Sequence, residues 1–257
     1  MTVRDVYRWL DGIAPFETQE GFDNAGLLLG DPSAQVTRVL FALDATLPVV
    51  EEASAWGANL LVTHHPLMFG GIRTLLSDQP EGRVLTAMVR AGISLIAAHT
   101  NWDRAEGGTG DSLAAAAGLT GIRPVADNPY LRAGQLPAPT AAVEYLRALT
   151  AALGWPIRMY GQPDAPVQQI AVGPGACGDL YQTAALNGAQ AFVVGEIKHH
   201  ELLGAQAMGT VVFEAGHHAS EQPGIAALYQ RFQSAAQAGQ WPVQARLTAI
   251  TPWVCTI

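Results

Sequence analysis

Apolar residues recur at helical spacing in the first segment of the chain, at Val3, Val6, Tyr7, Leu10 and Ile13. A repeat of three to four residues predicts a helix with one buried face. Thr2 and Asp5 stand three residues apart at its start, as in a capping box. The pattern therefore predicts a capped helix at the N-terminus.

From residue 38 onward, short apolar runs alternate with longer amphipathic stretches. The runs RVLFALD, LLVTHH and ISLIAAHT (38–44, 60–65 and 93–100) predict strands, and 46–58, 81–92 and 109–119 predict helices, the last beginning near Asp111. Strands that are apolar nearly throughout are typical of parallel sheets covered by helices. The first half thus predicts an α/β unit with a mostly parallel sheet.

Residues 121–139 interrupt this alternation with four prolines, which indicates a boundary between units. Beyond it the pattern predicts a helix at 140–154, strands at 157–161 and 168–173, a helix at 178–189, a strand at 191–197, a helix near 199–208, a strand at 210–216, a helix at 220–239 and a last strand near 246–250. We therefore expect two α/β units of similar size.

Composition narrows the class of protein. Of 257 residues, 49% are apolar and 14% charged, which favours a compact globular protein over a disordered one. The net charge of −8 argues against sequence-independent binding to nucleic acid. Neither a membrane span nor an apolar signal core is present, so we expect a cytoplasmic protein. Cys177 and Cys255 are far apart, so neither a disulfide framework nor a zinc ribbon is indicated.

The histidines indicate where the chemistry lies. All seven fall in four places: His64-His65, His99, His199-His200 and His217-His218. Three of the four places directly follow a predicted strand, and ligands of open α/β sheets bind beyond the carboxyl ends of strands. Adjacent side chains on a strand point to opposite faces, so His64 and His65 can converge only if the strand has ended, and Pro66 helps to fix such a turn. We expect the histidine clusters to meet in one cleft.

Two of these places also carry carboxylates, and counting plausible ligands gives His64, His65, Asp103, His217 and Glu221. Imidazole and carboxylate without thiolate suit zinc, manganese or iron. Five protein ligands are too many for one catalytic zinc, which keeps about three and an open position. They fit two divalent ions that share a bridging carboxylate, roughly 3.5–4 Å apart.

Other polar residues have simpler interpretations. His218 and His200 are expected either to contact the metal ligands without binding metal themselves or to be structural residues. His99 could either orient Asp103 or carry a proton. Asp23 and Asn24 are expected to close a turn and nothing more.

One motif favours a different function. Gly173–Gly178 matches G-x-G-x-x-G after a predicted strand, and Glu196 ends the next strand near the offset of a ribose-binding acid. However, Pro174 removes an N–H from the loop that would hold phosphate. We prefer a tight turn or an anion site to a dinucleotide site. The glycine-rich segment 106–112 also precedes a predicted helix, and alone it is equally weak evidence for such a site.

Five motifs together resemble one family. FDNAGLLLG, VTHHPLMFGG, AAHTNWDRAEGGTGDSLA, VGEIKHHELLGA and EAGHHASEQPGI, spread over residues 22–225, resemble the NIF-three-like family of GTP cyclohydrolase 1 type 2 homologs, in its short form without the central insertion. The paired histidines and the GHHxxE segment are the specific features. The glycine turns are not.

The resemblance implies an architecture and an assembly. It implies two α/β domains, 1–127 with 210–257 around the metal site and 128–209 as the second domain, and six chains in a ring. The implied ligands are His64, His65, Asp103, His217 and a bridging Glu221, the same five that ligand counting selects.

Three hypotheses about function follow. The first is a metal-dependent hydrolase in which hydroxide attacks C8 of a purine nucleotide, or a related phosphorylated substrate, with His99 or His218 carrying protons. The second is a non-catalytic metal-binding, interaction or regulatory protein. The third is a nicotinamide oxidoreductase that uses Gly173–Gly178.

Overall fold

The computed structural model describes residues 1–70, 72–126 and 128–252, and it separates into two compact units. Unit 1 comprises Met1–Glu106 and the described part of Ile225–Trp253, and unit 2 comprises Gly107–Gly224. The domain limits that the family resemblance implies, 127/128 and 209/210, lie at other residues and stay a prediction. Positions 127 and 253–257 of that assignment, with Cys255, lie outside the described residues.

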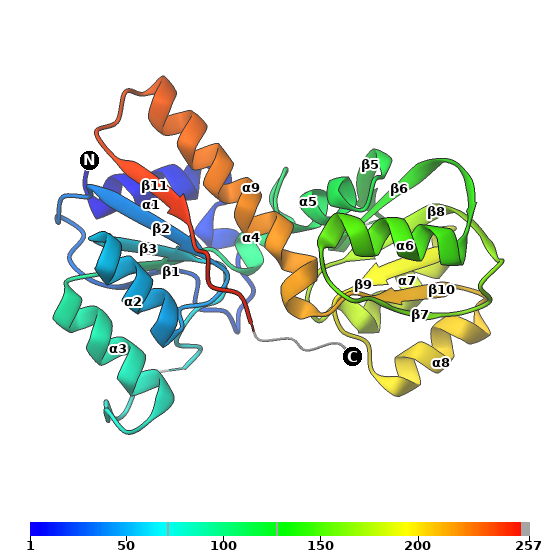
Figure 1. The fold of residues 1–257 in the computed structure, drawn as a ribbon, viewed down its shortest axis with the longest axis horizontal. Coiled ribbons are helices and arrows are strands. Elements are labelled where there is room, and N and C mark those ends of the chain that lie inside the picture. Colours follow the sequence, from blue (N-terminus) through cyan, green and yellow to red (C-terminus); the bar gives the residue numbers. More distant parts are fainter. Residues whose placement is uncertain (71, 127, 253–257) are drawn as a thin grey trace. The chain divides into compact units, whose positions relative to one another are not determined.

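Unit 1 contains a sheet whose described strands have the order β1-β4-β3-β2-β11. Figure 1 labels β1, β3, β2 and β11 of this sheet. Their bounds are β1 Gly26–Leu29, β2 Arg38–Ala42, β3 Leu60–Thr63, β4 Ser94–Ala97 and β11 Gln244–Leu247. The pairs β4-β3, β3-β2 and β2-β11 are parallel, whereas β1 runs antiparallel to β4. Strand β11 comes from the far end of the chain and completes this sheet beside β2.

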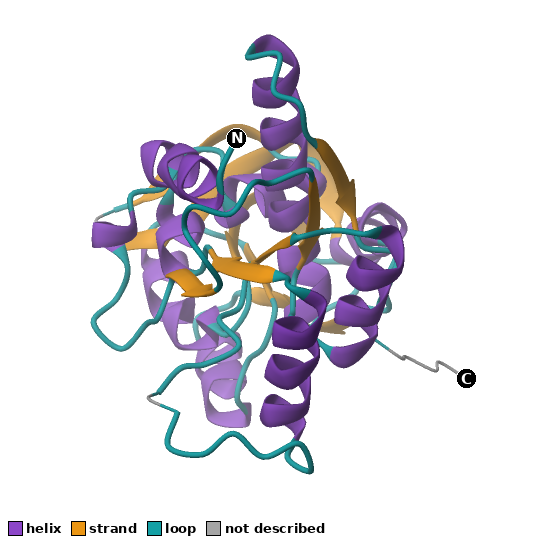
Figure 2. Ribbon diagram, turned by 90° about the vertical axis from the view of Figure 1, so that its left-hand side faces the viewer, coloured by secondary structure: helices purple, strands orange, loops and turns teal. Residues whose placement is uncertain are grey.

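Helices lie on both faces of this sheet, and Figure 2 shows the strands of unit 1 in orange among purple helices. The described helices of this unit are α1 Val3–Ile13, the 3₁₀ helix η1 Phe16–Thr18, α2 Leu47–Trp56, α3 Pro80–Ala91, α4 Thr100–Arg104 and the later part of α9 His217–Ala238. Alternate side chains of β2 enter different cores: Val39 and Phe41 pack with α1 and α9, and Leu40 and Ala42 pack with α2 and α3. The period of two confirms a strand buried on both faces.

The helix ends follow from local residues. Thr2 and Asp5 form the predicted capping box of α1, with Asp5 N–H donating to Thr2 Oγ1 at 3.3 Å and Thr2 N–H donating to Asp5 Oδ2 at 2.7 Å. Helices α2 and α3 end at Gly57 and Gly92, whose φ angles of +74° and +65° are in the left-handed region that favours glycine.

Unit 2 contains a second sheet, with the described strands in the order β5-β6-β8-β9-β10-β7. Their bounds are β5 Thr120–Val125, β6 Asn128–Ala141, β7 Arg158–Tyr160, β8 Pro166–Gly173, β9 Ala191–Val194 and β10 Val211–Glu214. Parallel pairing is confined to β8, β9 and β10, and the other neighbours are antiparallel. The sheet is therefore mixed, with its parallel strands in the middle.

The helices of unit 2 also cover both faces of their sheet. Those described are α5 Thr109–Ala116, α6 Ala142–Leu153, the 3₁₀ helix η2 Cys177–Leu180, α7 Tyr181–Leu186, α8 His199–Ala207 and the start of α9. Leu113 of α5 and Tyr145 of α6 pack on one face with Phe213. Ala184 of α7 and Ala205 of α8 pack on the other face.

The proline-rich segment 121–139, which the sequence marked as a candidate boundary, forms most of β5 and β6. Pro124 lies in β5, an edge strand, where a missing N–H is tolerated. Pro137 and Pro139 lie in β6 between Gln135 and Thr140, where the register with β8 shifts. Pro124, Pro137 and Pro139 thus occupy positions at which the lack of a backbone N–H does not break the hydrogen-bond ladder.

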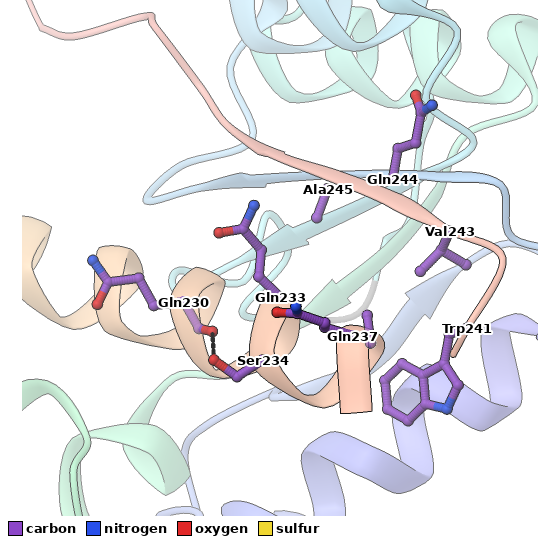
Figure 3. Close-up of a pocket in the computed structure, with 9 residues that line it drawn as sticks. Gln230, Gln233, Ser234, Gln237, Trp241, Val243, Gln244 and Ala245 are labelled. Atoms are coloured by element: carbon purple, nitrogen blue, oxygen red, sulfur yellow. Dashed lines mark hydrogen bonds between the residues drawn. The ribbon is translucent and has the colours of Figure 1, made fainter. Parts of the chain in front are cut away.

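Within the part of the chain that the structure describes, no helix is long and apolar enough to cross a membrane. A groove of about 640 Å³ lies between α9 and β11 (Figure 3). Its lining residues are Gln230, Gln233, Ser234, Ala236, Gln237, Trp241, Val243, Gln244 and Ala245. None of these side chains titrates, so the groove supplies no acid-base chemistry.

Candidate metal centre

Three histidines of unit 1 converge at the carboxyl ends of neighbouring strands. His64 and His65 follow β3, and His99 follows β4, which is parallel to β3. One ligand atom from each of the three lies within 4.8 Å of the others. The parallel pairing of β3 and β4 therefore brings together histidines that are more than 30 residues apart in sequence.

The adjacent pair His64-His65 converges because β3 has ended. The last strand residue is Thr63, whose hydroxyl donates to the carbonyl oxygen of His65 at 2.8 Å and closes a turn. The ring centroids of His64 and His65 lie 4.9 Å apart. Side chains that would diverge on a strand thus point into one cluster, as the sequence predicted.

In each of these histidines, Nδ1 faces an oxygen acceptor. The pairs are His64 with the carbonyl of Ala98 at 2.8 Å, His65 with Asp44 Oδ1 at 2.7 Å and His99 with Asp23 Oδ1 at 2.9 Å. Because a carbonyl or carboxylate oxygen accepts, the hydrogen belongs on Nδ1 and the lone pair of each neutral ring belongs on Nε2. Metal-binding histidines in proteins are usually held in this way.

Asp23 corrects an expectation, because it does more than close a turn. Its fully buried carboxylate accepts from His99, from the backbone N–H of Thr100 at 3.1 Å and from the Thr100 hydroxyl. Burial raises the pKa of this carboxyl, but hydrogen bonds from His99, Thr100 and the backbone of Asn24 outweigh burial and lower the pKa to about 2. Asp23 is therefore an anionic anchor for His99.

Asp44 is a second residue that the sequence did not single out. It lies beyond the end of β2, next to β3, and it holds His65. Asp23 and Asp44 each lie just outside an apolar strand, and that position is the signal that could have found them. It points to a histidine partner only once the order of the strands is known.

Asp103 lies on the short helix α4 and faces His64. The distance from His64 Nε2 to Asp103 Oδ1 is 3.3 Å, and the His64 side chain is 1% exposed. With its Nδ1–H donated to Ala98, a neutral His64 would direct a lone pair at a carboxylate oxygen. That contact becomes favourable when a proton or a metal cation lies between the two atoms.

Unit 2 carries the other predicted ligands on the start of α9. The helix begins at His217, three residues before the predicted start, so His217 and Glu221 lie one turn apart on one face. His217 Nε2 lies 3.2 Å from Glu221 Oε2, and His217 Nδ1 lies 3.3 Å from Glu196 Oε1. Gly216, at φ +85°, makes the turn from β10 into this helix.

The remaining histidines lie elsewhere in unit 2. The ring of His218 packs against Trp155, with centroids 5.5 Å apart. His199 and His200 are exposed on α8. The structure thus gathers His64, His65 and Asp103 in one unit and His217 and Glu221 in the other, and the joining of these two half-sites is a proposal.

The donor chemistry of both half-sites fits a divalent cation. Each combines imidazole nitrogen with carboxylate oxygen, and neither contains a thiolate. That donor set suits zinc, manganese or iron. The clustered histidines could hold a metal ion.

Comparisons with known proteins agree with the motifs. The model of the Duf34/NIF3 (NGG1p interacting factor 3) family matches residues 1–252. A GTP cyclohydrolase 1 type 2 homolog of Clostridium perfringens is 33% identical over 230 residues, 87% of this chain and 88% of that protein. One of Streptomyces coelicolor is 35% identical over 232 residues, 85% of this chain and 81% of that protein.

Solved structures show the same fold. A Bacillus cereus protein related to NIF3 superposes with a TM-score of 0.94 at 19% identity, covering 100% of this chain and 99% of that one. A Staphylococcus aureus protein superposes with a TM-score of 0.95 at 22% identity and the same coverage. The chain belongs to the Duf34/NIF3 family.

Proposed function

We propose that the protein binds two divalent metal ions per chain through His64, His65, Asp103, His217 and Glu221, with Glu221 as the bridge, and that it is a metal-dependent hydrolase. The single observation that supports this most strongly is the arrangement of Nδ1 partners. His64, His65 and His99 each donate Nδ1–H to an oxygen, so that Nε2 is the atom through which each neutral ring would bind a cation. The motif resemblance implies the same ligand set, and the model of the family matches residues 1–252.

Two such ions, when bound, lower the pKa of water toward neutrality and stabilise developing negative charge. The protein's own contribution is orientation. Asp44, Asp23 and the Ala98 carbonyl fix the three rings, so few rotamers compete with the binding geometry. We propose a purine nucleotide or a related phosphorylated compound as substrate, because curated relatives carry the name GTP cyclohydrolase 1 type 2 homolog.

His99 and His218 remain our proposed proton carriers. The structure adds a competing role for His99, because its ligand atom lies in the same cluster as those of His64 and His65. Metal content decides between the two roles. His99→Gln with two ions per chain but slow turnover makes His99 a proton carrier, whereas loss of one ion makes it a ligand.

The deciding experiment is the metal content of untagged protein, measured by mass spectrometry beside His64→Ala and Glu221→Ala. We expect about two equivalents in the wild type and fewer in both variants, with unchanged circular dichroism. Wild-type protein that takes up neither zinc, manganese nor iron would refute the metal centre. If the metal is present but a screen of nucleotides and phosphoesters shows no turnover, the alternative is a non-catalytic metal-binding or regulatory protein.

A further inference from the structure

The glycine turn, Gly173–Gly178, runs from the last residue of β8 into the first turn of η2 and packs tightly against the protein. A Cβ atom on Gly173 would lie 2.7 Å from Cys177 Cβ, and one on Gly178 would lie 2.7 Å from Ile197 Cα. The turn leads into a 3₁₀ helix and then into the six-residue α7, so it lacks the long helix that a dinucleotide site needs. Close packing explains the outer two glycines.

The middle glycine faces the half-site of unit 2. Gly175 is buried, and its φ of +58° is in the left-handed region. A Cβ atom at this position would collide with Glu221 Oε1 and would lie 3.2 Å from Glu221 Cδ and 3.3 Å from His217 Nε2. The space that a methyl group would fill is thus the space next to both proposed ligands.

Backbone hydrogen bonds fix the turn in this place. The N–H of Gly175 donates to Ser220 Oγ at 2.9 Å, and the Ser220 hydroxyl donates to the carbonyl of His217 at 2.8 Å. The carbonyl of Gly175 accepts from the N–H of Glu196 at 2.8 Å. Gly175 is therefore tied both to the first turn of α9 and to the acid that faces His217 Nδ1.

The Glu221 carboxylate is bounded on two sides. His217 Nε2 lies 3.2 Å from Glu221 Oε2, and the side of the Gly175 Cα that carries no Cβ faces Glu221 Oε1. Glu221 is 4% exposed, so a displaced carboxylate has little room to find another rotamer. Functional side chains must be held within about 0.5 Å of their productive geometry, and the walls around them provide that precision.

We propose that Gly175 is a positioning residue: its missing side chain leaves the space that sets the Glu221 carboxylate against His217. The steric part of this inference concerns packing alone. Its consequence for metal binding rests on the proposed function, because it requires His217 and Glu221 to be ligands.

The test is Gly175→Ala, compared with Gly188→Ala. Gly188 also lies in unit 2 and has a φ of +85°, but a Cβ there meets nothing within 4 Å. Both variants therefore carry the cost of alanine in the left-handed region, and only Gly175→Ala adds a methyl group against Glu221. Calorimetric titration with Mn²⁺ and with Zn²⁺ should show that Gly175→Ala binds each metal ion at least about tenfold more weakly than the wild type. Gly188→Ala should bind both ions with unchanged affinity.

A second readout does not require metal. In metal-free protein, Gly175→Ala should lower the melting temperature much more in the wild-type background than in the Glu221→Ala background, where the added methyl has room. In Glu221→Ala it should cost only about as much as Gly188→Ala, roughly 2–4 °C. Equal losses in both backgrounds, or wild-type metal affinity in Gly175→Ala, would overturn the proposal. Wild-type protein without metal affinity would refute the proposed function, and the coupling between Gly175 and Glu221 would still decide the steric inference.

Discussion

At the scale of single residues, the rings of His65 and His99 are each held by an aspartate from another part of the chain. The sequence shows histidines at strand ends and the four-residue spacing of His217 and Glu221, but it does not show these aspartates. Asp23 is 76 residues away from His99, and Asp44 is 21 residues away from His65. Such pairs become neighbours only through the order of strands in a sheet, which the hydrophobic pattern does not give.

Removing the Asp44 carboxylate should weaken metal binding without removing a ligand. Asp44→Ala leaves His65 in place but frees its ring to rotate and to exchange tautomers, so we expect metal affinity to fall by about 10- to 100-fold. Calorimetric titration measures this. Asp31→Ala is the control, because Asp31 caps a surface turn at Ser33. Unchanged affinity in Asp44→Ala would mean that the Nδ1 contact does not orient His65.

Asp23 should make the stability of metal-free protein depend on pH. Its pKa of about 2 in the folded protein lies below the ordinary value of 3.8, so the carboxylate form favours folding. The stabilisation, about 2 kcal/mol, is fully present above about pH 4 and is lost as the pH falls through about 2.

Urea unfolding of wild type and Asp23→Asn across this range tests the assignment. The difference between their free energies of unfolding should be largest near pH 6 and should shrink by about 2 kcal/mol toward pH 2. A difference that is independent of pH would show that Asp23 is not the titrating group.

At the scale of elements, the sequence predicted most helices and strands because their burial is periodic. Helix α1 begins at its predicted cap, and β2 and β3 are apolar on both faces because both faces are covered. The strands of segment 121–139 were not predicted, because its four prolines interrupt the periodic pattern. Whether a proline breaks a strand depends on which N–H groups the ladder uses, and that is decided by neighbouring strands.

Helix α9 stabilises unit 1 through one deeply buried aromatic residue. Phe232 is fully buried, with its ring centroid 5.3 Å from Phe41 and 5.2 Å from Trp9. Phe232→Ala should lower the free energy of unfolding by about 3–5 kcal/mol, through lost burial and a new cavity. The adjacent exposed Gln233→Ala, which only alters the groove, should change it by less than about 0.5 kcal/mol. Chemical denaturation of both variants measures the contrast, and similar losses would contradict this account of the core.

At the scale of the whole molecule, we propose the ring of six chains that the family resemblance implies. Several large apolar side chains are exposed in unit 1, a common feature of surfaces that other chains cover; they include Phe22, Phe69, Ile72, Leu75 and Leu76. Six chains of 27.1 kDa would give about 163 kDa. Light scattering after gel filtration should find that mass, and a monomer at micromolar concentration would refute the ring. The cytoplasmic location likewise stays a prediction.

Unit 1 is built from two separate segments of the chain, which affects the order in which the two units fold during synthesis. Strand β11 pairs with β2, although about 200 residues separate them, and the later part of α9 contributes Leu228 and Phe232 to the same core as α1. All of residues 107–224 leave the ribosomal exit tunnel before these elements do. Unit 2 can therefore fold while the first hundred residues still wait for their last strand, so the segment translated first is completed last. Chaperones should bind nascent chains mainly through the first hundred residues, whose sheet still lacks β11. This binding should end once residue 247 has left the exit tunnel.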